Sequence, residues 1–262
     1  MKDIKWYRAW DIVYPVGIYY VLMNVATFVV CLIVPLTDES YGFIKVLTTL
    51  FVLPVVYVMY RNDQLRRGVQ KAKAKELLFD MKSEILPLLG ILVMAACAAV
   101  VLNNLIAWTP LMKVSATYQS VTRKFFGGAV IFEILGPCIF VPIFRGLVYK
   151  RLREWLGMTW AVVISAIIFG MMHMNIVQFV YAGFLGVFLA LCVERTKHLY
   201  GAILAHMAAN TISVIRTETN WLSWMDESLQ AQALTTVGMG LVFIGLYLLV
   251  FWKGRENGRK TI

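Results

Sequence analysis

Cysteine is scarce in this sequence, and its placement argues against two kinds of site. The chain has four cysteines in 262 residues, and no two of them form a CxxC pair. All four fall within long apolar runs, so neither a disulfide framework nor a thiolate metal site is expected. We interpret them as small apolar packing residues. They are Cys31, Cys97, Cys138 and Cys192.

Charge is scarce within the apolar runs, and this indicates the class of protein. The chain is 60% hydrophobic with a mean hydropathy of +0.71, whereas soluble domains are about 45–50% apolar. The alternating segments of a transmembrane barrel are missing, as are internal repeats, low-complexity tracts and any segment typical of a soluble domain. The sequence therefore predicts an all-α integral membrane protein, a single polytopic domain over residues 1–262 with about eight transmembrane helices. The expected helices cover residues 12–36, 42–60, 85–107, 125–143, 158–173, 176–193, 199–215 and 234–252.

The first run is interpreted as a first span. It is too long for the core of a signal peptide, and no small-residue cleavage site follows it.

The basic residues gather on one side of the expected helices. Of the 25 lysines and arginines, 20 precede the first run, follow the last, or lie in the connections after the second, fourth and sixth runs. This pattern predicts a multi-pass protein of the cell membrane, expected to be a bacterial plasma membrane, with both termini cytoplasmic. The net charge of +10 is attributed to this topology and to contact with anionic headgroups of the bilayer, and no nucleic-acid partner is expected. The alternate connections carry Asp38, Glu39, Glu218, Asp226 and Glu227.

Ionisable residues at bilayer depth are costly and usually mark function. His173 ends the fifth run, and Phe169 lies four residues before it. His206 and Asn210 lie four residues apart in the seventh run. Residues at this spacing share one face of a helix, so the two histidines and the amide are expected to converge on one polar pocket.

Two further charged residues belong to the fourth run and its end. Glu133 lies near the middle of the run, where a carboxylate is protonated, paired or functional. Arg145 follows at the cytoplasmic end of the same helix, placed at the start of the fourth connection. It is expected either to reach the interface or to point inward at a carboxylate.

Three motifs in this order resemble the CPBP family of CAAX-processing and bacteriocin-processing intramembrane peptidases, which is related to the Ras-converting CAAX endopeptidase. The resemblance covers about residues 120–215, and the first three runs are similar only in topology. The first motif of the family reads P-x-x-E-E-x-x-F-R-G, and only its end is present here. The matches are FRG at 144–146, FxxxH at 169–173 and HxxxN at 206–210.

The resemblance implies water-mediated peptide cleavage within the membrane. It assigns water activation to two glutamates and His173, and oxyanion stabilisation to His206 and Asn210. Phe144 and Phe169 are expected to line the binding site, and the implied partners are hydrophobic or membrane-embedded peptides: prenylated CAAX tails, leader peptides or bacteriocin-type precursors. The family has been described both as metalloproteases and as glutamate-type proteases. No cofactor is expected here, because two histidines and an amide make a poor divalent-metal site without a carboxylate.

The glutamate pair of the first motif is missing from the stretch GPCIFVPIFRG, residues 136–146. Aligned without a gap, Phe140 and Val141 occupy the glutamate positions, five and four residues before Arg145. Aligned with a gap, about five residues including both glutamates are deleted between Ile143 and Phe144. Spacing does not decide between these alignments, and both replace two carboxylates with apolar surface.

Two functions follow from this pattern. The first is a family member whose peptidase chemistry is lost or weakened, a pseudoprotease that still binds a peptide or a membrane partner. The alternative is an active peptidase with an unconventional base, for which Glu133 is the best candidate. Glu133 lies seven residues before Phe140, so it faces the same way, but about 10 Å further along an ideal helix. A small transporter is disfavoured because no duplicated half is present.

Overall fold

A computed structural model describes residues 3–37, 39–68, 84–111, 134–219 and 221–252, and all regular structure in these ranges is helical. Six segments of the described residues are long and apolar enough to cross a membrane, which confirms the predicted helical, multi-pass membrane protein. The elements are α1 (Asp3–Cys31), α2 (Tyr41–Arg66), α4 (Ile85–Ala107), α7 (Pro137–Val141), the π-helix η1 (Pro142–Val148), α8 (Tyr149–Met171), α9 (Ile176–Thr196), α10 (Tyr200–Glu218), the 3-10 helix η2 (Ser223–Asp226), α11 (Leu229–Tyr247) and the π-helix η3 (Leu248–Trp252).

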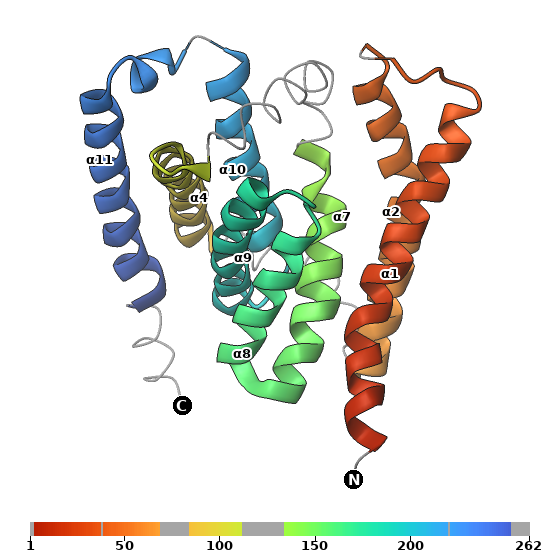
Figure 1. Ribbon diagram of the computed structural model, residues 1–262. Helices are drawn as coiled ribbons and strands as arrows, with labels where there is room; N and C mark the ends of the chain where they lie inside the picture. Colours follow the sequence, from red (N-terminus) through yellow and green to blue (C-terminus); the bar gives the residue numbers. More distant parts are fainter. Residues whose placement is uncertain (1–2, 38, 69–83, 112–133, 220, 253–262) are drawn as a thin grey trace.

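Gly157 divides α8 into two limbs. Its φ of 79° and ψ of 177° are not helical, and glycine adopts such angles without the steric cost of a Cβ atom. The first limb continues α7 and η1 down to the bend, and the second limb runs back beside it (Figure 1). The predicted fifth helix, 158–173, corresponds closely to this second limb.

The predicted end of the fourth helix at residue 143 is wrong. The helix continues through η1 into α8, and Arg145 lies on it rather than in a connection. Leu147, Val148 and Leu152 are buried along this continuation, so apolar packing carries the helix past the basic residues. The predicted beginning of this helix, 125–133, lies outside the described residues.

The helices pack as a bundle around the α8 hairpin. α8 packs against α9, while α10 packs against α4 and α9, and α11 packs against α4. α1 and α2 pair with each other and reach the hairpin through η1. Figure 1 shows α1 and α2 at one side, α11 at the other, and α8, α9 and α10 between them.

A buried carboxylate ties α2 to the hairpin near the bend of α8. Asp63 of α2 is 4% exposed. Its Oδ1 accepts hydrogen bonds from Nε and Nη2 of Arg151 at 2.9 and 2.8 Å, and its Oδ2 accepts one from Nε of Arg67 at 2.7 Å. Arg151 also donates to the Tyr14 hydroxyl at 2.7 Å and to the backbone carbonyl of Asp11, so α1 joins the same network. These bonds link three helices at one end of the bundle.

Candidate functional site

A cavity of about 270 Å³ lies between α1, α2 and the α8 hairpin. Its walls are mainly aromatic and apolar, with a histidine, a lysine and a few neutral polar groups. None of its lining residues is an aspartate or a glutamate within the described ranges. They are Tyr19, Tyr20, Met23, Asn24, Thr27, Lys45, Phe140, Phe144, Phe169, Met172 and His173.

His173 is positioned by the turn between α8 and α9. Its Nδ1 lies 3.0 Å from the backbone carbonyl of Phe169, one turn earlier. Asn175 then caps α9 by accepting hydrogen bonds from the backbone N–H groups of Val177 and Gln178 at 2.9 and 3.2 Å. This cap starts α9 two residues after His173, so the histidine lies in a short turn at the end of the second limb of α8.

Phe169 lies between the two histidines predicted to converge. Its ring centroid is 5.2 Å from that of His173 and 5.7 Å from that of His206, and both imidazoles stand nearly perpendicular to it. His206 is 6% exposed, and its Nδ1 has no hydrogen-bond partner among the described residues. The structure therefore brings both histidines to one aromatic ring, but only His173 is among the residues that line the cavity, and His206 lies buried behind Phe169.

Aromatic side chains of α7 and η1 pack between Tyr19 and the histidines. The Phe140 ring lies 6.4 Å from His206 and 5.7 Å from Tyr19 of α1. The Phe144 ring lies 5.2 Å from Phe169 and 6.4 Å from Tyr19. These rings form a continuous apolar wall beside the histidines.

Arg145 points inward, and its described partner is a hydroxyl group rather than a carboxylate. It is 1% exposed, its Nη1 donates to Ser165 Oγ at 3.0 Å, and its guanidinium lies 5.2 Å from the centroid of the Phe169 ring. Nε and Nη2 have no hydrogen-bond partner within the described part of the chain. Among the described residues, no carboxylate compensates this charge, which lies next to the site because Phe169 also contacts both histidines.

Gly186 of α9 leaves room for this guanidinium. A Cβ atom at this position would stand 2.8 Å from Arg145 Nη2 and 3.2 Å from the Ala166 Cα atom. We expect Gly186→Ala to lower the free energy of unfolding by about 1–3 kcal/mol, because the backbone of the second limb cannot move aside easily. Thermal unfolding in detergent measures this effect.

Gly183→Ala on the same helix is the matched control, since a Cβ atom there meets nothing within 4 Å. It should raise stability by up to about 1 kcal/mol, the usual gain of alanine over glycine in a helix. Equal melting temperatures for the two variants would contradict the close packing at Gly186.

Two other predicted residues are placed differently. Asn210 lies one turn after His206 on α10 and is partly exposed, but it is not among the residues that line the cavity. Glu133 lies outside the described residues. Glu194, another carboxylate of the second half, pairs with Arg153 at 2.8 Å and accepts a hydrogen bond from the Tyr149 hydroxyl at 2.9 Å, so it is engaged elsewhere.

Sequence reasoning missed the contributions of α1 and α2 to the cavity. Tyr19 is buried against Phe140 and Phe144. Lys45 lines the cavity with its ammonium 5.3 Å from the centroid of the Tyr41 ring. Lys45 could have been found, because it is a lone charge in the apolar first half of α2. Nothing local marks Tyr19.

The histidines do not form a convincing metal site. A resident zinc ion takes three or four protein ligands. Among the residues that the structure describes, histidine, cysteine, aspartate and glutamate nowhere gather in a group of three or more that could hold a metal ion. The donors of the described residues therefore do not fit a resident divalent metal.

Comparison with known proteins supports the resemblance seen in the motifs. The family model described as "Type II CAAX prenyl endopeptidase Rce1-like" matches residues 127–212. The chain is also similar to a protein of Bacillus subtilis (strain 168) named "Putative membrane peptidase YdiL", with 31% identity over 86 residues. That similarity covers 33% of this chain and 35% of the relative, and no solved structure matches. The matched segment contains the FRG, FxxxH and HxxxN motifs, and over this segment the chain is similar to the Rce1-like family of type II CAAX prenyl endopeptidases.

Proposed function

We propose that this chain binds a hydrophobic or membrane-embedded peptide in the cavity lined by His173, here called the histidine cavity. We also propose that its own peptidase chemistry is lost or severely weakened. The observation that carries the proposal is Phe140, whose ring lies 6.4 Å from His206 and lines the same cavity as His173. In the ungapped alignment this phenylalanine stands where the family has its first glutamate.

The chemistry of amide hydrolysis explains why the substitution matters. A general base within direct or one-water reach of the attacking water contributes roughly 10²–10⁴ to the rate. Phenylalanine cannot accept a proton, and its ring excludes the water that a glutamate would hold. His206 and Asn210 could still stabilise an oxyanion, but they supply no nucleophile.

The same cavity suits a bound peptide. Its aromatic walls offer apolar contact area, and small-molecule and peptide sites are typically apolar with a few polar groups that fix orientation. Lys45 adds a positive charge that makes no ion pair within the described ranges. A peptide with apolar side chains and a free carboxylate would satisfy both features.

The alternative, an active peptidase that uses Glu133 as its base, rests on His206. This histidine keeps a buried Nδ1 without a hydrogen-bond partner in the described part of the chain, as a group that awaits substrate would. Under this alternative, Glu133→Gln and His173→Ala each abolish processing.

The test uses the full chain in proteoliposomes and a fluorescent farnesylated peptide that ends in a CAAX sequence. We expect saturable binding, with no product above the background of empty vesicles by mass spectrometry. Lys45→Gln should weaken binding several-fold, since one charge-assisted contact is lost, and Lys45→Arg should restore it.

Each result separates the possibilities. If the natural chain cleaves the peptide and Glu133→Gln does not, the alternative is established. The proposal that peptidase activity is lost would then be wrong. A peptide that neither binds nor is cleaved would overturn the assignment of the cavity to peptides.

A further inference from the structure

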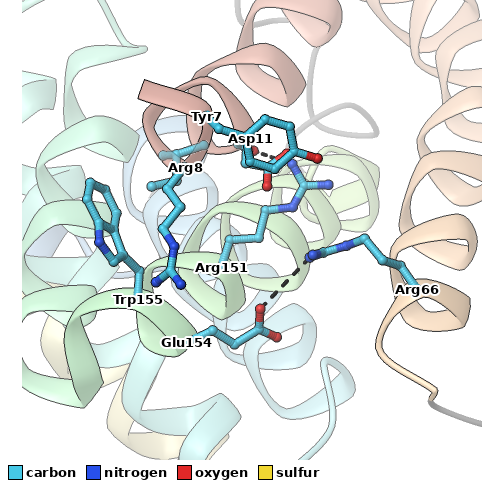
Figure 2. Close-up of a pocket in the computed structure, with 8 residues that line it drawn as sticks. Tyr7, Arg8, Asp11, Arg66, Arg151, Glu154 and Trp155 are labelled. Carbon is cyan, nitrogen blue, oxygen red and sulfur yellow. Dashed lines mark hydrogen bonds and ion pairs between the residues drawn. The ribbon is translucent and has the colours of Figure 1, made fainter. Parts of the chain in front are cut away.

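A second cavity lies at the end of the bundle where α1 begins, α2 ends and α8 bends. Its volume is about 350 Å³, and Figure 2 shows that its lining side chains come from these three elements. It is separate from the histidine cavity, with which it shares no lining residue. The lining residues are Tyr7, Arg8, Asp11, Ile12, Arg66, Arg151, Glu154 and Trp155.

Most of the charge around this cavity is already paired. Arg66 Nη2 lies 3.1 Å from Asp63 Oδ1 and 3.9 Å from Glu154 Oε2. Arg67, just behind the cavity wall, lies 2.7 Å from Asp63 and 2.8 Å from Glu154. Arg151 lies 2.8 Å from Asp63, so two carboxylates serve three guanidinium groups.

Arg8 is a cation at this cavity that does not take part in the network of ion pairs. It is exposed on α1 and has no hydrogen bond or ion pair in the described part of the chain, and in Figure 2 its guanidinium points into the space between Trp155 and Glu154. With Arg8 and the carboxylate of Asp11 included, four guanidinium groups stand against three carboxylates. Counted over the described residues, the cavity therefore carries one net positive charge.

Aromatic residues place this cavity at the level of the lipid headgroups. Trp6, Tyr7 and Trp10 are 83%, 69% and 64% exposed on the first turns of α1, and Trp155 lines the cavity from α8. Tryptophan and tyrosine concentrate at membrane–water interfaces, where an apolar ring and a polar tip are both accommodated.

We propose that this cavity binds the phosphate of an anionic phospholipid headgroup, with Arg8 and Arg66 as the donors. A phosphodiester carries one negative charge, which matches the single uncompensated positive charge. Guanidinium groups present paired donors that fit phosphate oxygens. The site goes beyond the proposed peptide-binding function and does not depend on it.

The test is native mass spectrometry of the full chain, released from detergent micelles with phosphatidylglycerol, phosphatidylcholine or inorganic phosphate as the probe. We expect phosphatidylglycerol to bind at least about tenfold more tightly than phosphatidylcholine, whose headgroup has no net charge. Arg8→Gln should remove about tenfold of that affinity, roughly the value of one charge-assisted contact. Arg8→Lys, which keeps the charge, should recover part of it.

Lys197→Gln is the matched control, because Lys197 is 72% exposed near the same end of the bundle and does not line the cavity. Equal losses for Arg8→Gln and Lys197→Gln would overturn the site in favour of general surface charge. Equal binding of the two lipids would also overturn it. If inorganic phosphate displaces phosphatidylglycerol at equal concentration, the ligand is a soluble phosphate and the proposal of a lipid headgroup is wrong.

Discussion

Replacing Phe140 and Val141 together with glutamate is expected to raise the rate of peptide cleavage at least about a hundredfold over the natural chain. The reason is that a positioned general base contributes roughly 10²–10⁴ to such a reaction. Phe140 is close to His206 and lines the cavity with His173. A carboxylate at position 141 would stand one turn before Arg145, whose guanidinium has two nitrogens without hydrogen-bond partners in the described ranges. Product formation from the farnesylated peptide measures the gain.

The control for this variant is the pair of glutamines at the same two positions, which matches the glutamates in size and polarity but cannot act as a base. It should stay at the background rate. Adding His206→Ala to the glutamate pair should also return the rate to background, because the oxyanion donor is then lost. A folded glutamate variant that cleaves nothing would count against the ungapped alignment, and insertion of two glutamates before Phe144 would then test the gapped one.

Replacing Asp63 with alanine is expected to lower the free energy of unfolding by about 3–5 kcal/mol, the usual loss when one partner of a buried ion pair is removed. Asp63 is 4% exposed and accepts hydrogen bonds from Arg66, Arg67 and Arg151. Without it, the buried Arg151 keeps, within the described ranges, only the Tyr14 hydroxyl and the Asp11 carbonyl as hydrogen-bond partners. Thermal unfolding of the full chain in detergent measures the change.

Glu154→Ala provides the comparison, because Glu154 belongs to the same network but is 50% exposed. Exposed ion pairs contribute about 0–1 kcal/mol, so this variant should remain close to the natural chain. The two variants unfolding at the same temperature would show that burial of Asp63 does not determine its contribution. Asp63→Leu combined with Arg151→Met should recover part of the lost free energy of unfolding. This double variant removes both members of the buried ion pair, so no buried charge is left without a partner.

The fold was largely predictable because hydropathy marks helices directly. The third helix was predicted at 85–107 and occupies those residues. The error at the end of the fourth helix has a physical cause. Arg145 and Arg151 are basic, and a sequence pattern assigns basic residues to connections, yet both are buried within the hairpin. Their partners, Ser165 and Asp63, lie 20 and 88 residues away in the sequence.

The candidate site was predictable only within single helices. The spacing of four residues placed Phe169 beneath His173, and the motifs selected His206. The aromatic wall could not be predicted in the same way, because Tyr19 reaches Phe140 from a helix more than 100 residues away in the sequence. Such a contact depends on how α1 packs against the continuous helix formed by α7 and η1, and the sequence of neither helix determines it alone.

The bend at Gly157 also has a consequence for biosynthesis. The limbs before and after it are joined through one non-helical residue. No loop separates them that would let one limb cross the membrane before the other. We therefore expect the two limbs to enter the bilayer together, as a hairpin. This matters for Arg145, because a lone arginine in the middle of a membrane helix is costly. Since Ser165 lies 3.0 Å from it on the returning limb, a hairpin that inserts as one unit would carry the guanidinium and its partner into the bilayer together.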